Sequence, residues 1–328
     1  MKIFMFLLRL FPPEIAHTLA LNILNFLYKI GLTKILFKVP KKEKHFYFNN
    51  LTFKNRVGVA AGLDKNGDFI DALGSLGFGF IEVGTVTPVQ QHGNPKPRIF
   101  RFKHQHAIIN RLGFNNKGVD YLVSRIQSRS FDGVLGVNIG ANKSSEGQKR
   151  IDDYVECFLK VAPYADYIAI NISSPNTPNL RTLHQKENLL PLLEAMDLAR
   201  VQANYSNPVF IKLSPDESNN TIFKIVDAIN KFQFHGVIVS NTTLEHDQFQ
   251  DSRNENISGG LSGKPLFEKS NLLLKTIHSY DSSLIKIGVG GVFNKEDFQQ
   301  KIESGASLVQ IYTSFIYQGP RIINKLLN

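Results

Sequence analysis

The sequence predicts an α/β fold, a (β/α)8 TIM barrel with a small helical extension at the N-terminus. The chain has 328 residues and is 42% hydrophobic, which is enough for one large packed core. After Lys54, short runs rich in Val, Ile and Ala alternate eight times with amphipathic stretches. Such apolar runs are typical of parallel strands buried on both faces, and eight of them favour a closed barrel over an open doubly wound sheet.

The expected elements follow one another in a regular order. The eight strands are Arg56–Gly62, Phe80–Thr87, Leu135–Gly140, Tyr167–Ser173, Pro208–Leu213, Gly236–Asn241, Leu284–Gly290 and Leu308–Tyr312. The helices expected between them include Glu187–Ala203, Asn219–Phe232, Pro265–Ser279 and Asn294–Ser304. A longer insertion at residues 88–134 contains several prolines and glycines, and its length indicates a functional loop.

The N-terminal segment differs from the rest in charge. Eight lysines and arginines in residues 1–45 face only Glu14 and Glu43, so +6 of the total charge of +10 lies there. The uncharged stretch Ile15–Tyr28 is 14 residues long, shorter than the roughly 20 that span a bilayer. A signal peptide fits poorly, because Arg9 interrupts the first apolar run and no clear cleavage site follows.

Two readings of this segment stay open. It forms either amphipathic helices that cap the main domain or, as we favour, helices that lie in a membrane interface with lysines near the headgroups. Residues 38–44 are expected to form a linker. We therefore divide the chain into residues 1–45, a membrane-associating helical segment, and residues 46–328, the barrel.

Metal and disulfide chemistry are not expected. Cys157 is the single cysteine, which excludes a disulfide framework and fits a reducing compartment. His104 and His106 lie in the insertion without metal-ligand spacing, and the short Asp64–Gly67 pattern lacks the rest of a calcium loop.

Polar residues follow every expected strand, which is where a barrel builds its active site. Asparagines dominate this set, and their amides suit a ligand with amide or imide edges, although each one alone could be a turn former. The asparagines are Asn110, Asn138, Asn171, Asn176 and Asn241.

Lysines and glycines add to the rim. Lys212 lies inside a buried strand and needs an anion or an electron-rich partner, whereas Lys65 could hold a carboxylate or orient a cofactor. A structural salt bridge is the alternative for both. The segment Gly288-Val289-Gly290-Gly291 after strand seven, with Tyr312 and Thr313 after strand eight, occupies the usual phosphate site of barrels. The glycine-rich segment Gly259–Gly263 after strand six could contribute to it.

These segments resemble the class 2, quinone-dependent and membrane-associated dihydroorotate dehydrogenases. The resemblance covers essentially the whole chain. It rests on the motifs Ala60–Lys65, Asn110–Asn116, Asn171–Asn176, Ser240–Thr243, Gly259–Gly263 and Gly288–Gly291, and on Pro13–His17 near the N-terminus. Leu112 and Phe102 stand where the family pattern varies.

The resemblance implies oxidation of dihydroorotate to orotate in pyrimidine biosynthesis, with FMN as hydride acceptor and a quinone as final acceptor. Ser174 would be the catalytic base, helped by a water relay or by Thr177. Lys212 would stabilise the anionic reduced flavin. The implied FMN ligands are Ala61, Gly62, Lys65, Thr85, Asn138, Asn171, Lys212, Ser240, Gly263, Gly291, Tyr312 and Thr313. The implied substrate ligands are Lys65, Asn110, Arg111, Leu112, Gly113, Phe114, Asn171, Asn176, Asn241 and Thr242.

The resemblance also implies a location. His17 and Arg101 would line the quinone entrance beneath the N-terminal helices. We expect a monomer without nucleic acid or an obligate protein partner, peripheral on the cytoplasmic side of a bacterial inner membrane.

Three rivals remain. A soluble class 1 dihydroorotate dehydrogenase would use fumarate or NAD, but that class has a cysteine base where Ser174 stands. A flavin-free phosphate-binding barrel, such as an aldolase, fits the asparagine set poorly. A non-enzymatic binder of membranes or nucleic acids does not need so polar a rim.

Overall fold

The computed structural model describes residues 8, 10–37, 45–176, 180–246, 249 and 257–328. Within these ranges eight parallel strands close into a barrel. They are β3 (Val57–Val59), β4 (Phe80–Val86), β7 (Val134–Ile139), β8 (Tyr167–Asn171), β9 (Val209–Leu213), β10 (Gly236–Val239), β12 (Ile285–Val289) and β13 (Leu308–Ile311). Each strand pairs with the next in chain order, and β13 pairs with β3. The predicted TIM barrel is therefore confirmed, and each observed barrel strand overlaps an expected one.

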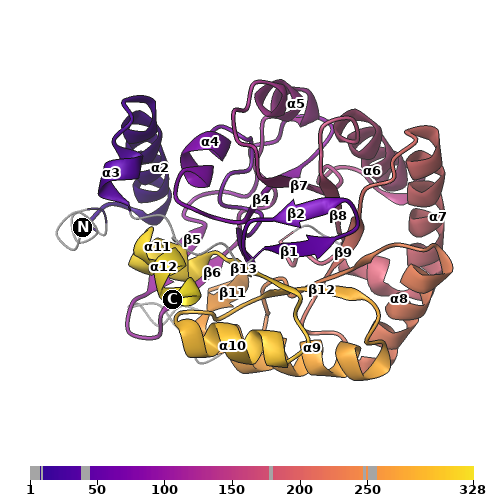
Figure 1. Cartoon of the computed structure of the whole chain (residues 1–328). Coiled ribbons are helices and arrows are strands. Elements are labelled where there is room, and N and C mark those ends of the chain that lie inside the picture. Colours follow the sequence, from indigo (N-terminus) through magenta and orange to yellow (C-terminus); the bar gives the residue numbers. More distant parts are fainter. Residues whose placement is uncertain (1–7, 9, 38–44, 177–179, 247–248, 250–256) are drawn as a thin grey trace.

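Helices surround the barrel, as Figure 1 shows. They are α4 (Ile70–Gly74), α5 (Val119–Gln127), α6 (Gly147–Val161), α7 (Lys186–Gln202), α8 (Asn219–Lys231), α9 (Phe267–Tyr280), α10 (Lys295–Glu303), α11 (Thr313–Gln318) and α12 (Arg321–Leu327), with the short 3-10 turns η1 (Arg181–His184) and η2 (Lys264–Leu266). Side-chain caps fix two starts, since Ser218 accepts from the Thr221 N–H and Asn294 from the Asp297 N–H. The apolar residues between strands and helices form the largest core cluster, which includes Cys157 in α6.

The barrel interior holds a second core. Its amino-terminal end is closed by the hairpin of β1 (Phe46–Phe48) and β2 (Leu51–Phe53), which sequence analysis did not predict. Phe53 packs edge-on against Phe80 at a centroid distance of 5.5 Å. An aromatic layer formed by Phe80, Tyr167 and Phe210 follows above it. The interior is thus a packed core and not a pore.

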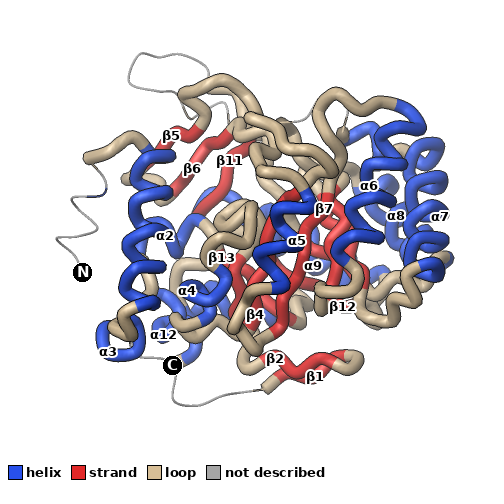
Figure 2. The backbone as a smooth tube through the Cα atoms, turned by 90° about the horizontal axis from the view of Figure 1, so that it is seen from above, coloured by secondary structure: helices blue, strands red, loops and turns tan. Residues whose placement is uncertain are grey.

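The insertion between β4 and β7 is more ordered than a loop. It forms β5 (Ile99–Phe102) and β6 (Ala107–Asn110), and β6 also pairs with β11 (Gly260–Gly263) from the far side of the barrel mouth. This three-stranded antiparallel sheet lies beside the N-terminal helix in Figure 2. It joins the loops after the second and sixth barrel strands into one wall.

The N-terminal segment forms α2 (Pro13–Lys29) and the short α3 (Thr33–Leu36). Both figures place these helices outside the ring, near α12 and the C-terminus. Arg98, just before β5, donates to both carboxylate oxygens of Glu14 and so ties α2 to the insertion. The expected linker at residues 38–44 and the apolar run before Leu8 lie outside the described residues.

Candidate active site

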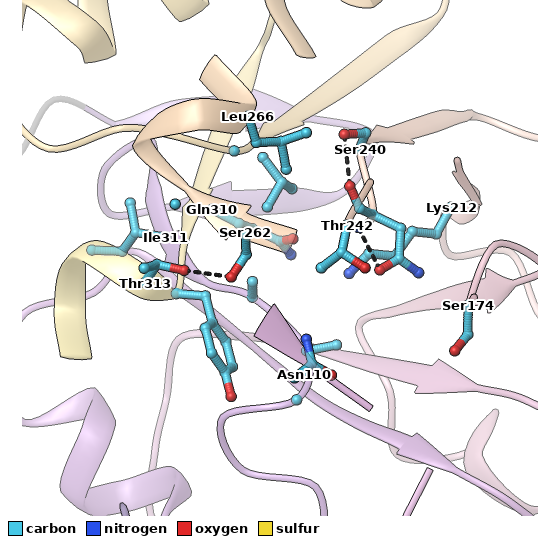
Figure 3. A pocket seen from close by; sticks show the side chains of 18 of the residues that line it. Asn110, Ser174, Lys212, Ser240, Thr242, Ser262, Leu266, Gln310, Ile311 and Thr313 are labelled. Atoms are coloured by element: carbon cyan, nitrogen blue, oxygen red, sulfur yellow. Dashed lines mark hydrogen bonds between the residues drawn. The ribbon is translucent and has the colours of Figure 1, made fainter. Parts of the chain in front are cut away.

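A polar cavity opens at the carboxyl ends of the barrel strands. Figure 3 shows Lys212 and Ser174 on one side of it and Thr313 and Ser262 on the other. Most predicted site residues lie in its wall: Ala61, Gly62, Lys65, Thr85, Asn110, Leu112, Gly113, Phe114, Asn171, Ser174, Asn176, Lys212, Ser240, Asn241, Thr242, Gly263, Gly291, Tyr312 and Thr313. The fold therefore gathers residues from seven of the eight barrel strand ends into one place; β7 contributes none to this wall.

Asn171 is the centre of a hydrogen-bond network at the end of β8. Its amide nitrogen donates to the Thr85 hydroxyl at 2.9 Å and to Asn138 Oδ1 at 3.2 Å. Its amide oxygen accepts from the Ser173 hydroxyl and, at 3.4 Å, from Asn241 Nδ2. Because these groups are buried and mutually bonded, their orientations are fixed before any ligand binds.

Ser174 lies in the loop that follows β8 and is 5% exposed. Its hydroxyl oxygen accepts a hydrogen bond from the Asn176 backbone N–H at 3.2 Å. The side chain of Asn176 donates to Asn110 Oδ1 across the cavity at 3.4 Å. Thr177, predicted to assist Ser174, lies outside the described residues. The loop and β6 thus present a hydroxyl and two side-chain amides to the same space.

A cluster behind the cavity holds the loops after β8, β9 and β10 together. The Asp216 carboxylate accepts from the Arg181 guanidinium at 2.8 Å and from the Lys269 ammonium at 2.6 Å. Arg181 in turn donates to the backbone oxygens of Ser173 and Thr242. Burial alone would raise the pKa of Asp216. These charge-assisted bonds outweigh that effect, so the pKa is lowered. Sequence reasoning missed this cluster, which positions the polar loops.

Lys212 fulfils the expectation that a buried lysine needs an anion. Its ammonium lies 3.9 Å from Glu82 Oε1, and the lysine also lines the cavity. Burial lowers the pKa of Lys212, and the negative charge of Glu82 opposes that shift. Neither Glu82 nor Gln310, which also lines the cavity, was identified from sequence, because both lie within strands and not at strand ends.

Lys65 also lines the cavity, in the loop after β3. It donates to the Gly62 carbonyl at 3.0 Å. Burial and the nearby charge of Arg98 lower its pKa to about 8. A carboxylate or another anion bound beside Lys65 would raise this pKa again and keep the ammonium charged, so the lysine is well suited to such a ligand.

The glycine loops form a close-fitting cradle at one end of the cavity. Gly290 and Gly291 have φ values of +120° and +75°, and a Cβ on Gly291 would lie 2.4 Å from Phe267 Cβ. Gly263 is equally constrained, with the His106 carbonyl 2.2 Å from such a Cβ. The hydroxyls of Ser262 and Thr313 are 2.9 Å apart beside these glycines. Glycine is required here because backbone must approach backbone or a ligand closely.

Two predicted residues lie away from the cavity wall. Asn138 is fully buried behind it, donating to Glu82 at 2.8 Å and accepting from Thr85 at 2.5 Å. The Arg111 side chain points elsewhere, since it bonds the Pro97 carbonyl and the Ser258 hydroxyl. Their roles as ligands remain predictions, and any role of Asn138 would run through its neighbours.

A second, apolar cavity of about 480 Å³ lies between α2, α3 and the barrel. His17 and Arg101, the predicted entrance residues, both line it, as do Leu21, Leu24 and Ile108. Asn110 and Tyr312 belong to the walls of both cavities. Burial, and then the charge of Lys65, lower the pKa of His17 to about 4, so its imidazole is neutral near pH 7.

The described ranges contain neither a metal-binding cluster nor a membrane-spanning helix. No group of three or more His, Cys, Asp or Glu side chains there could hold a metal ion. None of the helices in those ranges is both long and apolar enough to cross a bilayer.

The fold and the site define an α/β-barrel protein with its ligand cavity at the carboxyl ends of the strands, as in barrel enzymes. The family model described as dihydroorotate dehydrogenase matches residues 45–328. The chain therefore belongs to the dihydroorotate dehydrogenase family.

Individual relatives agree with this assignment and confirm the resemblance. The chain is 46% identical over 316 residues to a protein of Saccharophagus degradans named dihydroorotate dehydrogenase (quinone), covering 94% of this chain and 93% of the relative. A protein of Buchnera aphidicola with the same name is 46% identical over 327 residues, with 98% and 97% covered. A crystal structure from Eimeria tenella, of DHODH in complex with ferulenol, has a TM-score of 0.84 at 34% identity, covering 96% of this chain and 89% of that one.

Proposed function

We propose that this protein oxidises dihydroorotate to orotate in pyrimidine biosynthesis, with FMN as the first electron acceptor and a membrane quinone as the last. One observation carries the proposal: the polar cavity and the apolar cavity share Asn110 and Tyr312 as wall residues. A redox group in the first cavity would lie beside a hydrophobic acceptor in the second. Neither a flavin-free aldolase nor a simple binding protein needs this arrangement.

The first cavity fits FMN in two respects. Gly263, Gly290, Gly291, Tyr312 and Thr313 would hold the phosphate end, where glycines leave the backbone N–H groups accessible. Lys212, Thr85 and Asn171, supported by Asn138, would hold the ring, and the buried Gln310 Oε1 has no partner among the described residues. FMN would supply a two-electron acceptor for a hydride from carbon 6 of the substrate.

The substrate's uncharged edges match the asparagines. Asn110, Asn171, Asn176 and Asn241 offer amide donors and acceptors to the imide groups of a pyrimidine. Lys65 would pair with its carboxylate, and the buried Thr242 Oγ1, without a partner among the described residues, could take a further hydrogen bond. Leu112 and Phe114 would cover the ring and exclude water from it.

Ser174 would remove the proton from carbon 5 of the substrate. A serine hydroxyl is a weak base, so its oxygen needs stabilisation as negative charge develops on it. The Asn176 N–H, which already donates to Ser174 Oγ at 3.2 Å, would supply part of that stabilisation. The hydroxyl proton of Ser174 would leave as the substrate proton arrives, which requires a relay to solvent.

The second cavity would receive the quinone ring, with His17 and Arg101 at polar positions in an otherwise apolar wall. Exposed apolar residues continue along the outer face of the same helices. They are Ile15, Leu19 and Phe26 on α2, Ile30 directly after it, and Ile35 on α3. This face, with the basic residues of positions 1–45, would lie on the cytoplasmic surface of an inner membrane as a peripheral monomer. Residues 1–45 would thus form one functional unit and residues 46–328 the other.

The experiment is replacement of Ser174 by alanine. The variant should keep stoichiometric FMN but lose reduction of the flavin by dihydroorotate by a factor of about 10² or more, the contribution typical of a general base. Ser304→Ala, which removes a buried hydroxyl that donates to the Gln300 carbonyl outside the cavity, is the matched control and should reduce the flavin at a rate close to wild type. An unchanged rate in Ser174→Ala would place the base elsewhere.

A further inference from the structure

The inward-facing side chains of the barrel change from apolar to charged just below the floor of the first cavity. Along β4 and β9, Phe80 and Phe210 belong to the apolar layer, and the next inward-facing residues are Glu82 and Lys212. Glu82 has 0% exposed surface and lies among residues of four other strands. A fully buried carboxylate is costly unless every oxygen is satisfied, so its contacts indicate what it does.

Both oxygens of Glu82 are saturated. Oε1 accepts from Asn138 Nδ2 at 2.8 Å and lies 3.9 Å from the Lys212 ammonium. Oε2 accepts from the Tyr167 hydroxyl at 2.8 Å and from Gln310 Nε2 at 2.6 Å. The partners come from β7, β9, β8 and β13, so with its own strand β4 this one side chain connects five of the eight barrel strands.

This carboxylate fixes the direction of two amides. A carboxylate only accepts, so the NH2 groups of Asn138 and Gln310 must face it. The oxygen of Asn138 is therefore turned toward the Thr85 hydroxyl and the Asn171 amide, which line the cavity. The oxygen of Gln310 is buried without a partner among the described residues, and Gln310 itself lines the cavity. It is thus an acceptor available to a ligand N–H group.

The carboxylate also compensates the charge of Lys212. Burial lowers the pKa of Lys212, and Glu82 is the acidic residue whose charge opposes that shift. The other titratable groups nearby are Tyr167 below, which donates to Glu82, and Lys65 and Tyr312 at the cavity mouth. Burial raises the Tyr312 pKa to about 12, so it stays neutral and adds no anion. Without Glu82, Lys212 would have no anionic partner among the described residues.

We propose that Glu82 is the positioning residue of the cavity floor: it holds the positive charge on Lys212 and sets the donor and acceptor directions of Asn138 and Gln310 toward the bound ring. This inference rests on the proposed flavin site and deepens it. Glu82 does not line the cavity, so its effect is exerted through its partners. The floor then presents a cation at Lys212 and an acceptor at Gln310, both held by the same carboxylate.

The test uses the isosteric variant Glu82→Gln. The glutamine amide would have to turn its NH2 group toward some of the side chains that donate to Glu82 in the wild type. The substitution also leaves Lys212 without its anionic partner. We expect flavin to bind at least about tenfold more weakly, as loss of charged hydrogen bonds does. We also expect the flavin midpoint potential to gain an additional pH dependence, because the Lys212 pKa, already lowered by burial, would fall further without the opposing charge of Glu82. Equilibrium flavin titration and potentiometry at several pH values measure both.

A double-mutant cycle separates this role from a general loss of stability. In a Lys212→Met background, adding Glu82→Gln should leave the pH dependence of the potential unchanged. Tyr205→Phe is the structural control, because it removes one buried hydrogen bond, to the Ala165 carbonyl, outside the barrel interior. It should alter neither the potential nor flavin binding. If Glu82→Gln fails to fold, Glu82→Asp, which keeps the charge, should fold and retain the wild-type pH profile.

Wild-type potentials and flavin affinity in Glu82→Gln would overturn the inference. The inference would also be overturned if Glu82→Gln changed the pH dependence of the flavin potential equally with and without Lys212. Loss of the wild-type pH profile in Glu82→Asp would overturn it as well. Failure of the proposed function would look different, because the wild-type protein itself would then bind no flavin.

Discussion

The ion pair between Glu14 and Arg98 ties α2 to the barrel, so its loss should impair quinone reduction before it affects the barrel. Arg98 Nη2 lies 2.5 Å from Glu14 Oε1, and Arg98 Nε lies 3.2 Å from Oε2. Arg98 is 7% exposed, whereas the Glu14 side chain is 26% exposed. The perturbation is Glu14→Gln, which keeps the shape of the side chain and removes its charge.

The magnitude follows from these exposures. Breaking a fully buried pair costs about 3–5 kcal/mol, and an exposed pair contributes about 1 kcal/mol or less. This pair is intermediate, and Arg98 keeps its bonds to the His92 and Asn94 carbonyls. We expect Glu14→Gln to weaken docking of α2 by about 2 kcal/mol, a factor of about thirty in the docking equilibrium.

The assay compares two reactions of the same protein. Flavin reduction by dihydroorotate should stay at the wild-type rate, while the KM for quinone rises and amide hydrogens of α2 exchange faster. Asp132→Asn is the control, because the pair of Asp132 with Lys54 has the same chemistry at side-chain exposures of 79% and 39%. Wild-type exchange in α2 together with an unchanged KM, or an equal effect in Asp132→Asn, would refute this reasoning.

The pair also predicts an acid limit for docking. Burial raises the Glu14 pKa, but hydrogen bonds and charge from Arg98, with Lys96 and Lys65, outweigh it and the pKa is lowered. A lowered carboxyl pKa contributes stability that is present above the unfolded value of 4.5 and lost as the pH falls through the folded value. Faster exchange in α2 below about pH 4.5 should therefore appear in the wild type and be absent from Glu14→Gln.

Three further predictions concern single positions. Gly291→Ala should release flavin, seen as a low flavin-to-protein ratio, because its Cβ would lie 2.4 Å from Phe267 Cβ at a φ of +75°. Lys301, buried beside Ser270, has a pKa lowered by burial from 10.5 to about 7, so the folded state disfavours its charge and stability should rise with pH above 7. Lys301→Met should flatten this dependence in urea unfolding and be more stable at pH 6 by about 2–4 kcal/mol; equal slopes would contradict it. Because the His17 pKa is lowered to about 4, the quinone KM should be independent of pH from about 6 to 8; a transition near 6.5 would show that this imidazole titrates normally.

The barrel was predictable because its strands are buried on both faces. Runs such as Tyr167–Asn171 are apolar enough to be recognised without knowledge of their partners, and the polar residues that follow them mark the strand ends. The hairpin Phe46–Phe53 was missed because each of its strands has three residues, with Asn49 and Asn50 between them. Such strands are too short to show the alternation of apolar and polar residues. The antiparallel sheet of β5, β6 and β11 joins segments 150 residues apart, Asn110 and Gly260, and no local pattern specifies that pairing.

The site shows the same division. Residues at strand ends, such as Asn171 and Ser174, could be identified by position alone, and they do line one cavity. Glu82 and Gln310 lie inside apolar strands, and only the closed barrel brings them together at 2.6 Å. Arg111 belongs to a matching motif, yet its side chain turns to Pro97, because side-chain direction depends on the sheet that the sequence did not reveal.

The central claim is that one protein couples a polar cavity for pyrimidine oxidation to an apolar cavity for quinone reduction. Anaerobic rapid mixing of the purified protein with dihydroorotate, followed by a quinone in detergent, tests it most directly. The account predicts bleaching of the flavin absorbance by dihydroorotate and its full recovery on addition of quinone, with no recovery on fumarate or NAD. A protein without flavin absorbance, or a reduced flavin that fumarate reoxidises as fast as quinone does, would contradict the account.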